Sequence, residues 1–259
     1  MSTGMPARRA ALAALTAVDA KGAWSNLAVP EAIAELPSTR DRAFAAHLAY
    51  DTLRWEGTLD WALAQVLSRP PEDVEPVLRR ILRLGALQIL LTQVPIRAAV
   101  DTAVSLAREQ VPRRRAKGAG GFVNGVLRTL ARNQDELPWP DPKRDPIARL
   151  SLDHGHPRWI TSELYARLGA DRTEAILAAD NQPPGLTLRA TVDRSALLRE
   201  LVEQGYEVRP GSHPAALRVP GADPRELDAV AAGRAVPQDE ASMHVVAACQ
   251  VQPGDRVLD

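Results

Sequence analysis

Prolines divide the first 133 residues of this 259-residue chain into short segments, and each segment carries apolar residues at helical spacing. Proline ends or kinks a helix because it lacks the amide hydrogen that the helix needs. Breaks are expected at four places: Pro37, the Pro70–Pro71 pair, Pro95 and Pro112. Strand-like alternation is not found in residues 6–133. The segments therefore predict an all-α helical bundle.

One segment, which follows the Pro70–Pro71 pair, shows the helical pattern clearly. Its apolar face is formed by Val77, Ile81 and Leu84. Three arginines are expected on the opposite side of the same helix: Arg79, Arg80 and Arg83. The pattern predicts an amphipathic helix whose charges point away from the core.

The second half of the chain has a different sequence pattern, with a proline-rich stretch and strand-like segments. The stretch "DELPWPDPKRDPIARL" is rich in proline and predicts a stiff extended connector. Beyond two short helices, "GLTLRATV" and "ALRVPG" are strand-like, with a helix ending at Gly205 between them. The segment "QDEASMHVVAACQ" predicts a helix, and "QPGDRVLD" a turn into a new strand. We expect four regions: a helical domain (1–137), a Pro-rich linker (138–150), a small α+β domain (151–236), and the first helix and strand of a further domain (237–259).

Charge is unevenly distributed, although the net formal charge is zero. Residues 1–145 hold 20 Lys and Arg against 16 Asp and Glu, and basic residues cluster at Arg113–Lys117. This indicates local attraction of an anion. The single cysteine, Cys249, excludes an internal disulfide and a multi-cysteine zinc site. The five histidines match no metal-binding spacing, and no apolar run reaches the ~18 residues that span a bilayer. A soluble, cytoplasmic protein without a metal is expected.

The basic run leads directly into "GAGGFVNGVLRTLARN". One interpretation is that Gly120 and Gly121 form a flexible turn before an apolar helix, with the basic residues in a solvated loop. Alternatively, helix N-terminal amides and clustered guanidinium groups form a phosphate site, and the glycines let a nucleic-acid backbone approach. Phe122 and Asn124 are assigned to packing and to fixing the start of the helix. The candidates for phosphate contact are Arg113, Arg114, Arg115 and Lys117, with Arg128 and Arg132 as secondary candidates.

Several motifs resemble known proteins. "GFVNGVLR" resembles the last helix of the NusB-type RNA-binding fold, with "VDTAVSLARE" as the helix before it. "HPRWI", "NQPPGLTLRA" and "QDEASM" follow in the order of the RsmB (Fmu/Sun) family of bacterial 16S ribosomal RNA cytosine-C5 methyltransferases. "PGDRVLD" resembles the first strand of their methyltransferase domain. The resemblance implies a mainly α chain: a NusB-like bundle, a small α+β domain and the start of a Rossmann-like methyltransferase domain.

In that family the strand continues into a glycine-rich loop that holds S-adenosylmethionine, and two cysteines follow later. Neither feature is found in these 259 residues, and Cys249 is expected to be a small buried group. The resemblance therefore implies the RNA-binding portion of a longer enzyme, with no catalytic, cofactor-binding or metal-binding residue of its own. Two alternatives remain: a NusB-type antitermination module acting through RNA and a ribosomal protein, or a structural helical scaffold. Residues 145–259 argue against the antitermination module, because that fold needs nothing after the helical bundle.

Overall fold

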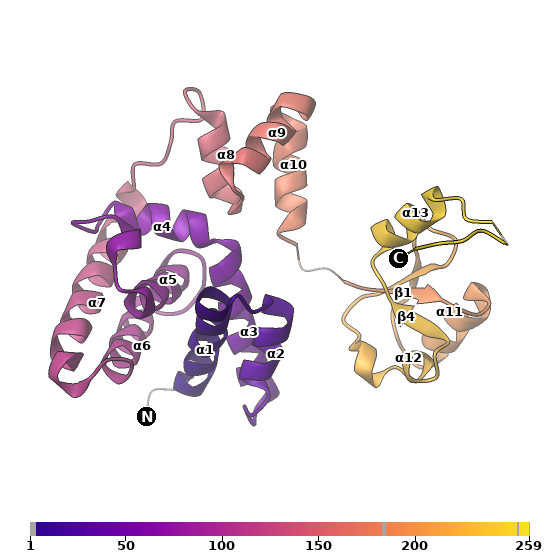
Figure 1. Ribbon diagram of the computed structural model, residues 1–259, viewed down its shortest axis with the longest axis horizontal. Coiled ribbons are helices and arrows are strands. Elements are labelled where there is room, and N and C mark those ends of the chain that lie inside the picture. Colours follow the sequence, from indigo (N-terminus) through magenta and orange to yellow (C-terminus); the bar gives the residue numbers. More distant parts are fainter. Residues whose placement is uncertain (1–3, 183–184, 253, 259) are drawn as a thin grey trace. The chain divides into compact units, whose positions relative to one another are not determined.

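The computed structural model describes residues 4–182, 185–252 and 254–258 (Figure 1). The chain forms two compact units, divided between Asn181 and Gln182. The described part of the first unit contains helices and no strand, as the sequence predicts. The helices are α1 (Met5–Lys21), α2 (Ser25–Ile33), α3 (Thr39–Arg54), α4 (Glu56–Ala64), α5 (Pro76–Leu90), α6 (Ile96–Glu109), α7 (Arg113–Asn133), α8 (Pro146–His154), α9 (Arg158–Leu168) and α10 (Ala170–Asp180).

Helix α5 is the centre of the helical core. It packs against α1, α3, α4, α6 and α7, and buries Ile81, Leu84 and Leu87 almost completely. Gly85 permits a close approach of α7, because a Cβ atom there would lie 2.4 Å from a methyl carbon of Leu127 on α7. The apolar face predicted for this segment is thus confirmed, and it fixes α7 directly onto the core.

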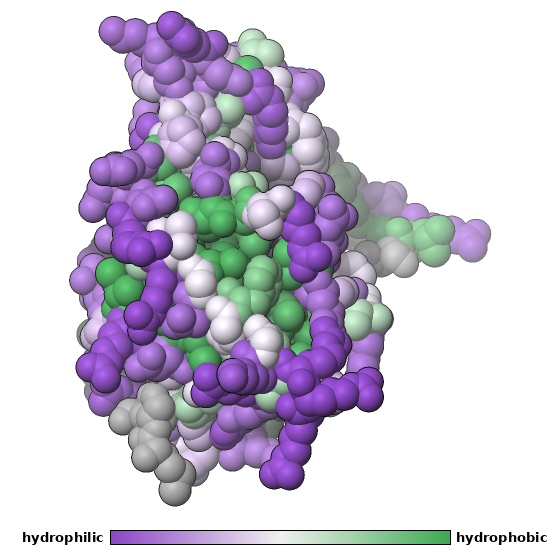
Figure 2. Space-filling view, turned by 90° about the vertical axis from the view of Figure 1, so that its left-hand side faces the viewer, coloured by the Kyte–Doolittle hydropathy of each residue, from purple (hydrophilic) through white to green (hydrophobic). Residues whose placement is uncertain are grey.

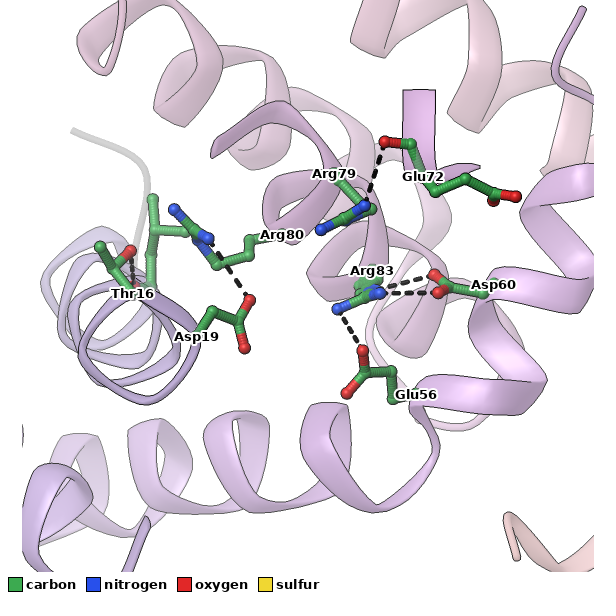
Figure 3. Close-up of polar contacts among 9 residues, drawn as sticks. Thr16, Asp19, Glu56, Asp60, Glu72, Arg79, Arg80 and Arg83 are labelled. Atoms are coloured by element: carbon green, nitrogen blue, oxygen red, sulfur yellow. Dashed lines mark hydrogen bonds and ion pairs between the residues drawn. The ribbon is translucent and has the colours of Figure 1, made fainter. Parts of the chain in front are cut away.

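The prediction that the α5 arginines point away from the core is wrong for two of them. Arg80 and Arg83 are only 7% and 6% exposed. Arg83 pairs with Asp60 at 2.6 Å and Glu56 at 2.7 Å, and Arg80 with Asp19 at 3.3 Å (Figure 3). Burial of a charge is tolerated only when it is paired, and here α1 and α4 supply the carboxylates.

The Pro-rich segment has no helix between Leu137 and Asp145, as predicted, but the extended connector predicted for all of residues 135–150 is wrong beyond these limits, because α8 begins at Pro146 and a short 3-10 helix ends at Glu136. The Asp145 carboxylate accepts a hydrogen bond from the amide of Ala148 at 2.9 Å, which fixes this helix start. Helices α8, α9 and α10 pack on one another, and Thr58 of α4 donates to the carbonyl of Leu152 at 2.8 Å. The three helices therefore belong to the first compact unit, while the domain limits inferred from the sequence stay predictions.

The second unit is a small α+β fold, as predicted. Its elements are β1 (Leu186–Ala190), α11 (Arg194–Glu203), β2 (Arg209–Pro210), β3 (Ala216–Val219), α12 (Asp228–Ala231), β4 (Ala235–Pro237) and α13 (Glu240–Ala248). The sheet is antiparallel with strand order β2-β3-β1-β4, and Leu188 lies opposite both Leu217 and Pro237. Leu188, Leu201 and Leu217 are fully buried and form its core.

The strand expected in "QPGDRVLD" is not formed by the residues described there. Residues 254–258 pair with none of the described strands, and Leu258 is 99% exposed. A strand needs a partner for its backbone groups, which explains the difference. Pro253 and Asp259 of this segment lie outside the described residues.

Candidate nucleic-acid interface

Helix α7 begins at Arg113, directly after Pro112. The basic run therefore forms its first turns, and the predicted loop with a helix start near Gly120–Gly121 is wrong. Pro112 has φ −54° and ψ 144°, so the chain is extended there and can turn into a helix only at the next residue. Packing of Val123, Leu127 and Leu130 against the core holds the glycine-containing helix together.

The first turn of α7 has free hydrogen-bond donors. The amide of Arg115 donates to the carbonyl of Pro112 at 2.8 Å. Within the residues described, the amides of Arg113 and Arg114 have no acceptor, and Pro112 offers no side-chain cap. Free amides at the positive end of a helix dipole are a favourable place for a phosphate.

The structure brings four of the six predicted residues together at this end, and we call Arg113, Arg114, Arg115 and Lys117 the α7 basic cluster. All four are exposed. Arg115 forms an ion pair with Glu75, which precedes α5. In the described part of the chain, Arg113, Arg114 and Lys117 have no carboxylate partner. Three positive charges of the cluster are therefore available to an anion.

The two secondary candidates lie further along the same helix. Arg128 and Arg132 are both exposed, and Arg132 donates to the Thr129 hydroxyl at 3.2 Å. Fifteen residues separate Arg113 from Arg128, which is about 22 Å along a helix axis. The six residues thus form two groups on one helix rather than one site.

A glycine stripe, formed by Gly118, Gly121 and Gly125, lies between these groups. All three are exposed, and a Cβ atom at any of them would meet no heavy atom within 4 Å apart from its chain neighbours and the backbone of its own helix. Gly120 differs, because a Cβ atom there would lie 2.6 Å from Nε of Arg108 on α6. The stripe leaves the helix backbone open to close approach.

Two hollows follow the junction of α6 and α7. One, of about 410 Å³, is lined by Ser105, Arg108 and Gly121; the other, of about 510 Å³, by Arg97 and Arg128 among others. Figure 2 views this side, where apolar residues are bordered by hydrophilic ones. Arg97 and Arg108 were not among the residues predicted from the sequence, although their positions on the polar face of the α6 segment could have indicated them.

A third hollow of about 410 Å³ lies beside the α7 basic cluster and is lined by Arg69, Arg114 and Phe122. Phe122 packs against the helical core, as expected. The guanidinium of Arg69 also lies 5.9 Å from the centre of its ring. Arg69 was missed because it comes from a different segment, directly before the Pro70–Pro71 pair.

Cys249 lies at the end of α13 and is exposed, so the expectation of a buried thiol is wrong. Its sulfur contacts the carbonyl of Val245 at 3.5 Å. Among the described residues, no three His, Cys, Asp or Glu side chains are arranged to hold a metal ion. None of the described helices is long and apolar enough to cross a bilayer.

Comparison with protein families finds two matches in order along the chain. Residues 5–132 match the NusB family, and residues 156–224 match the Methyltr_RsmF/B-like, ferredoxin-like domain. The first range covers α1 to α7 almost completely, and the second runs from the loop before α9 through β3 to Pro224.

Curated relatives match over nearly the whole chain. The putative methyltransferase Rv1407 of Mycobacterium tuberculosis is 40% identical, covering 96% of this chain and 55% of the relative. The probable ribosomal RNA small subunit methyltransferase B of Bacillus subtilis is 33% identical, covering 97% of this chain and 56% of the relative. The chain therefore spans about half the length of the curated relatives it matches.

A solved structure shares the fold. The crystal structure of PH0851 superposes with a TM-score of 0.70 at 20% identity, covering 98% of this chain and 57% of that chain. The two domain matches follow one another along the chain, and the relatives match nearly all of it. The chain therefore carries a domain of the NusB family followed by an RsmF/B-like ferredoxin-like domain, and its sequence is similar to that of ribosomal RNA small subunit methyltransferase B proteins.

Proposed function

We propose that this chain is the RNA-binding portion of an S-adenosylmethionine-dependent methyltransferase that modifies cytosine C5 in 16S ribosomal RNA in the cytoplasm. The observation that carries the proposal is the start of α7. Arg113, Arg114 and Lys117 have no carboxylate partner among the described residues and lie beside two amides that have no acceptor there. The names of the relatives and the NusB domain of this chain support the choice of ribosomal RNA as the ligand.

In this proposal the α7 basic cluster binds phosphates without reading the sequence of the RNA. Lysine and arginine contacts to phosphates release counterions and supply most of the non-specific affinity. The glycine stripe would let the sugar-phosphate backbone pass close to the helix toward Arg128 and Arg132. The apolar floor of the larger α6–α7 hollow, formed by Ile96, Val100 and Ala131, would then face riboses or bases.

The methyl transfer itself is not assigned to these residues. Attack on cytosine C6 needs a thiolate activated by its surroundings. Cys249 is exposed at a helix end, and the structure places no Lys, Arg or His side chain in hydrogen-bond contact with its sulfur among the described residues. The described residues around 254–258 form no strand and glycine-rich loop that would hold S-adenosylmethionine. We therefore derive no catalytic step from them.

The test is a triple variant, Arg113→Gln, Arg114→Gln and Lys117→Gln, measured for binding to a 16S ribosomal RNA fragment at several salt concentrations. Each lost phosphate contact should reduce the slope of log affinity against log salt by roughly 0.7–0.9. The matched control removes three exposed cations elsewhere: Lys143→Gln, Arg172→Gln and Arg199→Gln. An unchanged slope in the α7 variant, or an equal change in the control, would contradict the proposal.

A further inference from the structure

Asp101 of α6 is the only acid among the described residues that line the two hollows of the α6–α7 junction, and it lines both of them. Its side chain is 58% exposed, and its ion pair with Arg97 spans 3.6 Å. An exposed pair of this kind contributes little to stability. A carboxylate also repels phosphates, so it weakens the attraction of this face for RNA. An acid at this place helps RNA binding only if it meets a hydrogen-bond donor.

Asn124 of α7 lines the smaller of these hollows, of about 410 Å³, which we call the Asn124 hollow. Asn124 was expected to fix the start of the helix, but α7 begins at Arg113 and Asn124 lies in its interior. Asparagine is a poor helix former, and the half-buried carboxamide of Asn124 makes no hydrogen bond with the residues described. Its donors and its acceptor are therefore free for a ligand in the hollow.

Arg108 of α6 supplies a cation to the Asn124 hollow. It lies close against α7 because Gly120 has no side chain: a Cβ atom there would be 2.6 Å from Nε and 3.0 Å from Cγ of Arg108. Arg108 is exposed and has no carboxylate partner among the described residues. Seven residues separate it from Asp101, which is about 10 Å along a helix axis. A carboxylate, a carboxamide and a guanidinium group thus border one hollow.

We propose that the Asn124 hollow binds one unpaired guanine base of the RNA, and that Asp101 determines this specificity. Guanine is the only one of the four RNA bases that presents two adjacent donors, N1–H and the N2 amino group, on one edge. A carboxylate accepts hydrogen bonds from both. The other edge of guanine presents O6 and N7 as acceptors, for which arginine is the commonest partner, and Arg108 and the Asn124 amide can donate there.

The hollow suits a base from single-stranded RNA. In loops and at ends, bases are splayed out of the stack and are recognised on their edges by protein side chains. The volume lies within the range of small-molecule sites, and the exposed Gly121 leaves space for the flat face of a base. The inference rests on the proposed function, since it names the base that the α6–α7 face would recognise.

The experiment measures the affinity of the 259-residue chain for three single-stranded RNA oligonucleotides by fluorescence anisotropy. The oligonucleotides are rich in uridine and differ at one central position, which is guanosine, inosine or adenosine. Inosine lacks only the N2 amino group, whereas adenosine lacks both donors of that edge. A good bidentate contact to a base discriminates by about 5- to 150-fold, so guanosine should exceed adenosine by this factor, with inosine between them.

Asp101→Ala distinguishes a base contact from a general effect of charge. Loss of the negative charge should raise the affinity for the adenosine oligonucleotide, while the preference for guanosine falls below about twofold. Asn124→Ala should reduce the preference in part without raising the affinity for adenosine. The matched control is Glu163→Ala on α9, because Glu163 is 59% exposed and also pairs with an arginine four residues away; its preference should equal that of the unmodified chain. If Asn124→Ala does not fold by circular dichroism, Asp101→Ala decides, since Asp101 is exposed.

The inference is overturned if the unmodified chain binds the three oligonucleotides equally. It is also overturned if Asp101→Ala raises the affinity but keeps the preference for guanosine, because the carboxylate then acts only through its charge. Loss of the preference in the Glu163→Ala control would have the same consequence.

The α7 triple variant keeps this result separate from the proposed function. Phosphate contacts do not depend on the base, so this variant should weaken the binding of all three oligonucleotides and keep their order. If it lowers the salt slope while the unmodified chain shows no preference among the bases, the proposed function is supported and the guanine site is contradicted. If the unmodified chain binds none of the oligonucleotides at low salt, both proposals are overturned.

Discussion

Helices α5 and α7 each carry a cluster of arginines, yet the two clusters meet opposite environments. On α5, Arg80 and Arg83 are buried and paired with acids. On α7, Arg113 and Arg114 are exposed and have no carboxylate partner in the described chain. The difference is set by which carboxylates the rest of the fold brings to each helix. Arginine density alone therefore does not mark an RNA surface; unneutralised and accessible charge does.

The largest expected effect tests the α5 side of this comparison. Arg83→Met would leave Asp60 and Glu56 without the cation that they share, and these two side chains are 29% and 43% exposed. Breaking a fully buried pair costs about 3–5 kcal/mol in the free energy of unfolding. Because water can partly solvate these two carboxylates, the expected cost is about 2–3 kcal/mol. Urea unfolding measures this. The control is Arg97→Met on α6, because Arg97 is 93% exposed and pairs loosely with Asp101 at 3.6 Å; its cost should stay below about 1 kcal/mol.

RNA affinity of the folded Arg83→Met protein should equal that of the unmodified chain. A stability loss as small as that of Arg97→Met would show that the α5 cluster behaves as a surface cluster. The proposed distinction between the two helices would then fail.

A smaller effect is expected in the second unit, where an arginine–carboxylate pair is intermediate between these cases. Arg218 is 58% exposed, while its partner Glu240 is buried. Hydrogen bonds from Arg218, Ser212 and the His213 amide lower the pKa of Glu240 from 4.5 to about 2. Because the folded pKa is depressed, the stabilisation is present above pH 4.5 and is lost as the pH falls toward 2.

Hydrogen exchange of peptides from β1 and β3 across this pH range should show the loss, and Glu240→Gln should flatten it. The control is Glu207→Gln, since Glu207 is 59% exposed in its pair with Arg209. If the Glu240 variant keeps the full pH dependence, another carboxyl group is responsible.

The smallest expected effect tests whether the α7 basic cluster contributes to RNA affinity. Arg115 is the member of the α7 basic cluster that is paired, with Glu75. Glu75→Gln frees that cation and removes a negative charge from the surface, so RNA affinity should rise about two- to fivefold. Filter binding at low salt measures it, with Glu72→Gln as a control because Glu72 is exposed and makes no ion pair among the described residues. Equal affinities in both variants would mean that Arg115 does not contact RNA.

Much of the fold could be predicted from local patterns, because proline breaks and apolar periodicity report on neighbours within one helix. The helical first unit and the α+β second unit are confirmed on that basis. The burial of Arg80 and Arg83 could not be predicted, since their partners lie 61 and 23 positions away in the sequence. The helix start at Arg113 was missed because the glycines were given more weight than Pro112. Arg113, Arg114, Arg115, Lys117, Arg128 and Arg132 stay predictions as RNA-binding residues.

The glycines of α7 also have a dynamic consequence. Four of them lie between Gly118 and Gly125, and each lowers helix stability by about 1 kcal/mol relative to alanine. The turns before them bury no side chain, whereas the turns from Val123 to Leu130 are anchored in the core. Local opening is easiest where few apolar contacts hold a segment. The first turns of α7 are thus the part of the helix that should exchange between ordered and frayed states, and an anion that binds there would act as the missing cap that holds them closed.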